Sequence, residues 1–401
     1  MAIAPHHVEP DFSSADFFRD PYRSFRNYRE AAPVFCNRDG VVYLTRHGDC
    51  AELFGSPDCL RQPPGKTVTP FGSVSREFTA LERMINHWLI FMDPPRHDVV
   101  RKAFMPAFTA RAVRQLRPLI ADQVGKLLDQ FPADGNVDLI ERFSAPLPLR
   151  VIGSIMGLPD DDFDQIYAWS TKLSEVLDTG EEQAMQAGEE TARAMHRYFA
   201  DLLAQRRDLR PDCIINAVSD INDSTLSPDE LLYGFAFLLF SGNETTRHLL
   251  SSGILTLAQN PSQLDVLRKR PHLAEEAIDE MIRFESPVQK ISRWTHNDVL
   301  FGDYHVETGT HVTALIGAAN RDPDIFAQPD KFDIQRLSNR HLGFGAGSHY
   351  CLGSLLARLE SSIAFQELWS RTHDIELEEF KWRPVSSMRS LDVLKARVRL
   401  K

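Results

Sequence analysis

The cysteine with chemically suggestive neighbours is Cys351, in a run that begins at Phe344 and reads Phe-Gly-Ala-Gly-Ser-His-Tyr-Cys-Leu-Gly. The glycines would let the backbone approach a flat cofactor and adopt conformations that other residues avoid. Backbone N–H groups in such a turn can hydrogen-bond to the sulfur and tune it. Residues 352–360 are predicted to be helical, so a helix N-terminus would lower the pKa of the thiol and favour a thiolate ligand. The other four cysteines are scattered without paired zinc spacing, and we expect reduced, buried thiols there.

Polar groups interrupt an apolar segment at Ser241-Gly242-Asn-Glu244-Thr245-Thr. Leaving such groups buried and unpaired would cost roughly 1–3 kcal/mol each. One explanation is a helix end or a kink whose polar groups bond internally. The other is that the groups line a reactive site.

Two pairs of residues have the spacing of neighbours on one helix face. His97 and Arg101 lie four apart after Met-Asp-Pro-Pro, and they could present two cationic donors to carboxylates. Glu280 and Arg283 lie three apart and can form an ion pair. Each pair alone could equally be an ordinary exposed pair.

The elements that would position these residues are mostly helical. Apolar spacing predicts helices over 114–128, 139–156 and 183–205, and a helix that begins at Ser227-Pro-Asp-Glu. Short strands are predicted at 41–45, 299–301 and 311–315, with a long loop over 56–80. The sequence therefore predicts a mainly α fold with small β-sheets.

Composition excludes several classes of function. The net charge of −11 disfavours binding to nucleic acid or to an anionic membrane. The longest apolar stretch, 231–240, is far shorter than the ~20 residues of a membrane-spanning helix. The N-terminus lacks a signal pattern, so we expect a cytoplasmic protein.

In order along residues 92–360, these segments resemble the cytochrome P450 family of haem-thiolate monooxygenases. The resemblance implies one domain over 1–401, a helical prism with small β-sheets. It implies haem b (iron protoporphyrin IX), with Cys351 as the iron ligand. Propionate binding would fall to His97, Arg101, Arg293 and His349. Arg336 would join Glu280 and Arg283 in a network that braces the cysteine loop.

The resemblance also implies a reaction. Glu244 would relay protons and Thr245 would organise water beside O2, while Ser241 stands where the family more often has alanine. One oxygen atom of O2 would enter a C–H bond of a small, largely apolar organic substrate. The chain has no dinucleotide fingerprint and no iron–sulfur cysteine cluster, so a separate ferredoxin or flavodoxin with its reductase would supply electrons. We expect a basic docking patch of Lys102, Arg111, Arg114 and Arg358.

The substrate pocket is the least specified part of the site. The candidate wall residues are Phe237, Phe240, Ser241, Val288 and Ile291, with Phe71, Phe78 and Met84 from the segment 60–90. Many of these could instead be core residues, the commoner fate of Phe and Met at helical spacing. Two other functions stay open: a peroxide-driven or oxidative-coupling enzyme, and a haem sensor without turnover. The intact Glu244–Thr245 pair favours the monooxygenase.

Overall fold

The computed structural model describes residues 3–65, 78–221 and 225–401. Its contacts divide the chain into two compact units, each built from more than one segment of the chain. The first unit comprises Met1–Gly65, Val124–Ser144 and Thr245–Lys401, and the second comprises Lys66–Gln123 and Ala145–Glu244. The single-domain organisation expected for 1–401 stays a prediction.

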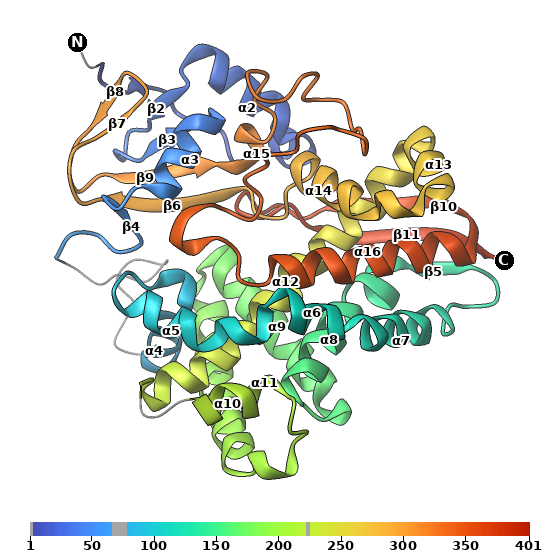
Figure 1. The fold of residues 1–401 in the computed structure, drawn as a ribbon. Helices are drawn as coiled ribbons and strands as arrows, with labels where there is room; N and C mark the ends of the chain where they lie inside the picture. Colours follow the sequence, from blue (N-terminus) through green and yellow to red (C-terminus); the bar gives the residue numbers. More distant parts are fainter. Residues whose placement is uncertain (1–2, 66–77, 222–224) are drawn as a thin grey trace. The chain divides into compact units, whose positions relative to one another are not determined.

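Every strand in the described residues belongs to the first unit. The larger sheet has the order β1-β2-β3-β9-β6-β4, as Figure 1 shows in part. Its strands are β1 (His6–His7), β2 (Val34–Cys36), β3 (Val42–Leu44), β9 (His311–Leu315), β6 (Lys290–Thr295) and β4 (Cys59–Leu60). Two smaller sheets are β10 (Thr372–Trp382), β11 (Leu391–Leu400) and β5 (Asn136–Asp138), and the hairpin of β7 (Val299–Phe301) with β8 (Tyr304–Val306). The predicted strands over 41–45, 299–301 and 311–315 are confirmed.

The first unit buries one face of the larger sheet under a helix. Residues of β3, β9 and the β7–β8 hairpin form one apolar cluster with Leu53 and Phe54 of α3 (His47–Gly55). The remaining helices of this unit include α1 (Ala15–Arg19), α2 (Pro21–Ala31), α13 (Pro261–Lys269), α14 (Ala274–Phe284), α15 (Ile316–Ala319) and α16 (Ser354–Arg371). The predicted helix over 352–360 is therefore confirmed in kind, but it begins later and runs longer.

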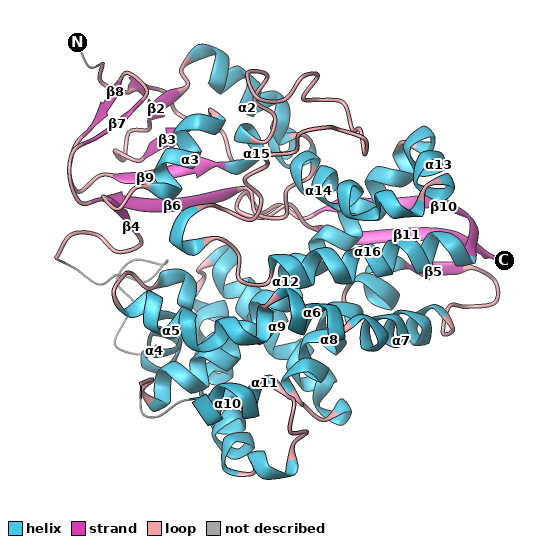
Figure 2. Ribbon diagram, viewed as in Figure 1, coloured by secondary structure: helices cyan, strands magenta, loops and turns pink. Residues whose placement is uncertain are grey.

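Helices make up the second unit, and they predominate in the whole ribbon (Figure 2). They are α4 (Thr79–Asn86), α5 (Arg96–Phe104), α6 (Ala110–Gln115), α8 (Pro146–Met156), α9 (Phe163–Thr179), α10 (Glu182–Ala204) and α11 (Ile214–Ile221). The helix α10 matches the prediction for 183–205. The mainly α prediction with small sheets is confirmed.

Two helix predictions need correction, and proline is the reason for both. The segment 114–128 is not one helix, because α6 ends at Gln115 and α7 (Arg117–Leu128) follows. Pro118 cannot donate a backbone hydrogen bond to the preceding turn. In 139–156, a short π turn at Ile140–Ser144 precedes α8, which begins at Pro146.

The helix α12 (Pro228–Gln259) passes from the second unit into the first. Its start is the predicted capping box: Ser227 N–H donates to Glu230 Oε2 at 2.8 Å, and Glu230 N–H donates to Ser227 Oγ at 3.3 Å. The helix is unbroken at Gly242, so the helix end considered for this position is wrong. Within the described residues, neither α12 nor any other helix combines the length and apolarity that crossing a membrane requires.

In the predicted loop 56–80, the structure has the two-residue strand β4, and α4 begins at Thr79. Residues 66–77, including Phe71, lie outside the described residues.

Candidate functional site

The cysteine loop is held in a conformation that requires glycine. Gly345 and Gly347 have φ of 70° and 67°, in the left-handed region. A Cβ atom on Gly347 would lie 2.3 Å from the backbone oxygen of Phe54 on α3, so no larger residue fits. Cys351 N–H donates to Phe344 O at 2.9 Å and closes the loop. The loop therefore presents Cys351 in a defined place.

The environment of Cys351 differs from that of a core thiol. Cys351 is partly exposed and forms no disulfide, whereas Cys50, Cys59 and Cys213 are buried. Cys36 is partly exposed too, so the buried thiol expected there is wrong. The helix α16 begins three residues later, at Ser354. The unpaired N–H groups of a helix start favour a nearby thiolate over a thiol. The start of α16 is thus a setting that would stabilise a thiolate at Cys351.

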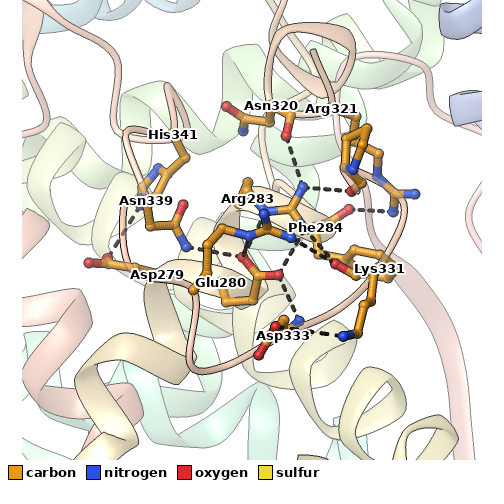
Figure 3. A network of polar contacts seen from close by, with 12 residues as sticks. Asp279, Glu280, Arg283, Phe284, Asn320, Arg321, Lys331, Asp333, Asn339 and His341 are labelled. Carbon is orange, nitrogen blue, oxygen red and sulfur yellow. Dashed lines mark hydrogen bonds and ion pairs between the residues drawn. The ribbon is translucent and has the colours of Figure 1, made fainter. Parts of the chain in front are cut away.

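A buried ion pair on α14 lies beneath the segment that leads to the loop (Figure 3). Glu280 and Arg283 both have fully buried side chains, and they form two hydrogen bonds, of 2.7 and 2.8 Å. The other Arg283 N–H groups donate to the backbone oxygens of Asn320, Pro329 and Lys331. All the N–H donors of this guanidinium are therefore used.

Glu280 has further partners on the chain that approaches the loop. Arg336 Nε and Asn339 Nδ2 each donate to Glu280 Oε2 at 3.1 Å, and Asp333 N–H donates to Oε1 at 2.8 Å. The predicted network of Arg336 with the Glu280–Arg283 pair is confirmed. Its partners extend over 333–339, so it fixes the chain that enters the cysteine loop.

A second pair of contacts ties α16 to α14. Arg358 Nε donates to Asp279 at 2.8 Å, and His341 lies 3.3 Å from the same carboxylate oxygen. Burial would raise the pKa of Asp279, but His341 and Arg358 bring it below its usual value. The Arg358 guanidinium also lies 4.4 Å from the centroid of the Phe344 ring. Because Arg358 is engaged in these contacts, it differs from the exposed docking residue that the sequence suggested.

Arg293 lies on β6 and is 4% exposed. Its guanidinium lies 5.8 Å from the ring centroid of Phe54, the residue whose backbone oxygen faces Gly347. His349 lies in the short 3-10 turn Gly347–His349, two residues before Cys351. The first unit thus brings together three of the predicted cofactor residues around Phe54 and the loop.

The other two predicted propionate residues lie on α5 in the second unit. His97 is fully buried, with Nδ1 2.8 Å from Asp98 Oδ1, and Arg101 follows one turn later. The helix is fixed to the start of α12 by an ion pair between Arg96 and Glu230. Burial would raise the pKa of Glu230, but Arg96 and Ser227 lower it to about 2. His97 and Arg101 therefore stand on a firmly anchored helix.

Between residues 230 and 257 of α12, partial exposure is confined to one stripe. Around the polar interruption, Phe237, Ser241 and Thr245 are partly exposed at intervals of four residues, and Gly242 adjoins them. Glu244 is 4% exposed. A Cβ atom on Gly242 would lie 3.2 Å from Ile152 of α8, so this glycine also permits close helix packing. The stripe thus places the two hydroxyl-bearing residues Ser241 and Thr245 on one face of the helix.

The candidate wall residues differ in exposure. Trp88 stacks on Phe240 with ring centroids 5.0 Å apart, Met84 is fully buried, and Phe78 is 9% exposed. Phe240, Met84 and Phe78 are therefore core residues, as the alternative interpretation expected for Phe and Met. Phe237 also contacts Trp88 but stays partly exposed.

In the first unit, Val288 and Ile291 are partly buried against the apolar cluster. Val288 pairs with Met388 in an isolated antiparallel bridge, a contact that the sequence did not predict. Asn243 was also missed: it is fully buried, and neither of its amide atoms has a hydrogen-bond partner among the described residues. The only signal was a polar residue inside an apolar run.

The donor set fits haem. A partly exposed cysteine on a glycine-rich loop can serve as a thiolate ligand, and arginine and histidine side chains suit carboxylates. Cys351, Arg293 and His349 lie in the first unit, and His97 and Arg101 lie in the second.

Comparisons with known proteins identify the family. The cytochrome P450 family model matches residues 267–386. A biotin biosynthesis cytochrome P450 from Bacillus subtilis is 34% identical over 390 residues, which cover 95% of this chain and 97% of the relative. The 6-deoxyerythronolide B hydroxylase of Saccharopolyspora erythraea is 33% identical and is covered to 98%.

Solved structures are also similar to this chain. The crystal structure of P450BioI with a hexadec-9Z-enoic acid ligated acyl carrier protein is similar at a TM-score of 0.90 and 32% identity, covering 96% of this chain and 99% of that one. The cytochrome P450 fold expected from the sequence is thereby confirmed. The chain belongs to the cytochrome P450 family of haem-thiolate monooxygenases, oxidoreductases whose cofactor is haem b.

Proposed function

We propose that this enzyme inserts one oxygen atom of O2 into a C–H bond of a small, largely apolar organic substrate, with Cys351 as the iron ligand. The single observation that carries the proposal is the glycine-dependent loop that presents a partly exposed Cys351 before α16. When bound, haem supplies the binding and activation of O2. The chain's own residues position the haem and the substrate, exclude water and move protons.

Four residues are proposed to bind the propionates: His97, Arg101, Arg293 and His349. Buried or partly buried cationic donors form strong hydrogen bonds with carboxylates. Arg293 is supported by its burial on β6 and by Phe54, which also contacts the loop. His97 is supported by its full burial on α5, where water would not compete for its ring.

Glu244 and Thr245 are proposed to move protons and to order water. The Thr245 hydroxyl lies on the partly exposed stripe of α12, where it could hold a water molecule by donating or accepting a hydrogen bond. Glu244 is almost fully buried beside it, and its carboxyl could hold a proton and pass it to that water. Ser241, one turn earlier on the stripe, would add a second hydroxyl.

We test this role with Thr245→Ala and Glu244→Gln. We expect each variant to consume reductant at a rate near that of the parent while forming roughly tenfold less product, because general acid–base groups contribute at least that much. Organic product and consumed reductant are measured together. Product per reductant equal to that of the parent in both variants would remove both residues from the proton pathway.

The substrate is proposed to contact Phe237, Ser241, Val288 and Ile291. Partial exposure of these mostly apolar side chains supports this assignment, whereas Phe240 is buried and stacks on Trp88. Two relatives are named as the 6-deoxyerythronolide B hydroxylase and the vitamin D(3) 25-hydroxylase, so hydroxylation of an apolar molecule is a consistent activity. A screen of apolar ligands for the spin-state change that follows water displacement would identify the class.

A separate ferredoxin or flavodoxin with its reductase is the proposed electron source. Lys102, Arg111 and Arg114 are exposed on α5 and α6 of the second unit and could attract an acidic partner. The double charge reversal Arg111→Glu with Arg114→Glu should slow reduction by a surrogate ferredoxin, most strongly at low salt. An unchanged rate would argue against this docking surface. Faster turnover with peroxide alone than with ferredoxin would favour the peroxide-driven alternative.

A further inference from the structure

Lys290 and Ser386 form an amine–hydroxyl pair in the first unit. Lys290 is the first residue of β6, and successive side chains of a strand point to opposite faces of the sheet. It therefore lies on the face opposite to Ile291 and Arg293. Its partner on β9 is Leu315, which belongs to the apolar cluster formed with residues of α1 and α2. The pair is thus on the other face of the sheet from the proposed haem and substrate residues of β6.

The contact between the two side chains is supported by the backbone beside it. Lys290 Nζ donates to Ser386 Oγ at 2.7 Å. In the adjacent residues, Gln289 N–H donates to the backbone oxygen of Ser387 at 2.8 Å. The segment that carries Ser386 is therefore fixed to the start of β6, which keeps the amine and the hydroxyl within hydrogen-bond distance.

The surroundings of Lys290 favour a neutral amine. The groups that face it are the Phe12 ring, whose centroid lies 4.5 Å from Nζ, Leu315 and the Ser386 hydroxyl. None of these carries a charge. Burial lowers the pKa of Lys290 to about 8, and no charged group among the described residues contributes to this shift. A neutral amine can accept the proton of a hydroxyl group and so act as a general base.

Ser386 is accessible to an incoming molecule. Its side chain and that of Lys290 are both partly exposed. The backbone N–H groups of Ser386 and Ser387 donate to no group in the parts of the chain that the structure describes. Free N–H groups beside a nucleophile can stabilise the oxyanion that forms during acyl transfer. The pair therefore combines a hydroxyl, a base and unused donors.

Aromatic side chains adjoin the pair. Phe12 contacts the rings of Tyr28 and Tyr43, with centroids 6.2 and 5.4 Å away. All three rings are partly exposed where they pack against the apolar cluster. Partly exposed rings offer an apolar surface on which an aryl group can stack.

We propose that Ser386 and Lys290 form an acyl-acceptor site, at which the serine takes the acyl group of an activated aryl ester. Ser386 Oγ attacks the ester carbonyl carbon, and the bond to the aryloxide breaks as the new C–O bond forms. The hydroxyl proton passes to Lys290 Nζ and then to the aryloxide. The products are an O-acylserine and a phenol, and nothing is oxidised or reduced. Serine–lysine pairs perform acyl transfer on other folds.

The experiment treats the purified holoenzyme with 4-nitrophenyl acetate and locates the acetyl group by peptide mass spectrometry over time. Ser386 should be acetylated about a hundredfold faster in the parent than in Lys290→Met, because a general base contributes at least that much. Lys290→Arg should be as slow as Lys290→Met, since a guanidinium keeps its proton. Ser387→Ala is the matched control, because it removes the neighbouring hydroxyl and leaves the pair intact. Its rate should equal that of the parent.

The pH dependence of the parent gives a readout that does not depend on how the variants fold. Acetylation of Ser386 should become faster as the pH rises through about 8 and then level off, because only the neutral amine accepts the proton. A rate that continues to rise with hydroxide up to about pH 10 would overturn the proposal. So would an acetyl group on Lys290 in place of Ser386, no acetylation of Ser386, or equal acetylation in Lys290→Met. The site uses neither haem nor O2, so these results are independent of the proposed monooxygenase function.

Discussion

Replacement of Glu280 by glutamine probes the buried network on α14. The change preserves shape but removes one negative charge. Glu280 accepts hydrogen bonds from Arg283, Arg336, Asn339 and the Asp333 backbone, and its side chain is fully buried. A glutamine would also turn an NH2 group toward donors that need an acceptor. The Arg283 cation would then be buried without its counter-charge.

The expected loss of unfolding free energy is about 3–5 kcal/mol, the range for breaking a buried ion pair by removing one partner. The chain offers a matched control in Asp16 and Arg19. This pair has the same spacing of three residues and a 2.6 Å separation, but the side chain of Asp16 is 82% exposed and that of Arg19 is 76% exposed. Asp16→Asn should therefore change the unfolding free energy by no more than about 1 kcal/mol.

The assay is urea unfolding of the holoprotein, followed by tryptophan fluorescence and by haem absorbance. For Glu280→Gln, the unfolding midpoints measured by both probes should shift to lower urea concentration. The haem signal should change before the fluorescence or together with it, since the network fixes the chain entering the cysteine loop. If Glu280→Gln and Asp16→Asn destabilise the protein equally, the reasoning about burial is refuted.

Two other substitutions test the loop and a buried carboxyl. Gly347→Ala should impair haem incorporation, because the new Cβ would meet the Phe54 oxygen at 2.3 Å and the backbone φ is 67°. The control is Gly48→Ala on α3, which should incorporate haem normally because no atom lies within 4 Å of the new Cβ. Equal incorporation by both variants would contradict the account. Burial raises the pKa of Glu360 to about 8. At neutral pH the folded protein therefore holds this carboxyl neutral, whereas the unfolded chain ionises it once the pH exceeds the ordinary pKa of glutamate. Stability should therefore fall between about pH 4.5 and 8 by about 1.4 kcal/mol per unit. Glu360→Gln should lack that fall and be more stable at pH 7 by up to about 3 kcal/mol, as measured by urea unfolding across this pH range; a parallel pH dependence in both proteins would show that the carboxyl is ionised when folded.

The sequence predicted the parts of the site that depend on short segments. The cysteine loop, the capping box at Ser227 and the Glu280–Arg283 pair each lie within ten residues, so residue type and spacing define them. The predicted addition of Arg336 came from the family resemblance. Periodicity likewise predicted α10, and the sequence also predicted the short strands β3, β7 and β9.

The rest depends on contacts between segments that are distant in the sequence. Cys59 meets Thr295 only because β4 pairs with β6, and Met388 meets Val288 only through an isolated bridge. Local periodicity carries no information on such registers. The division of 114–128 at Pro118 was a different failure, in which apolar spacing was given more weight than the missing backbone donor.

The carbon monoxide difference spectrum of the freshly reduced protein tests the central claim most directly, because its absorption maximum reports the ligand opposite carbon monoxide. The account predicts the long-wavelength band of a thiolate-bound haem, and its loss in Cys351→Ala. A histidine-type band in the native protein, or an unchanged thiolate band in Cys351→Ala, would contradict the assignment of Cys351.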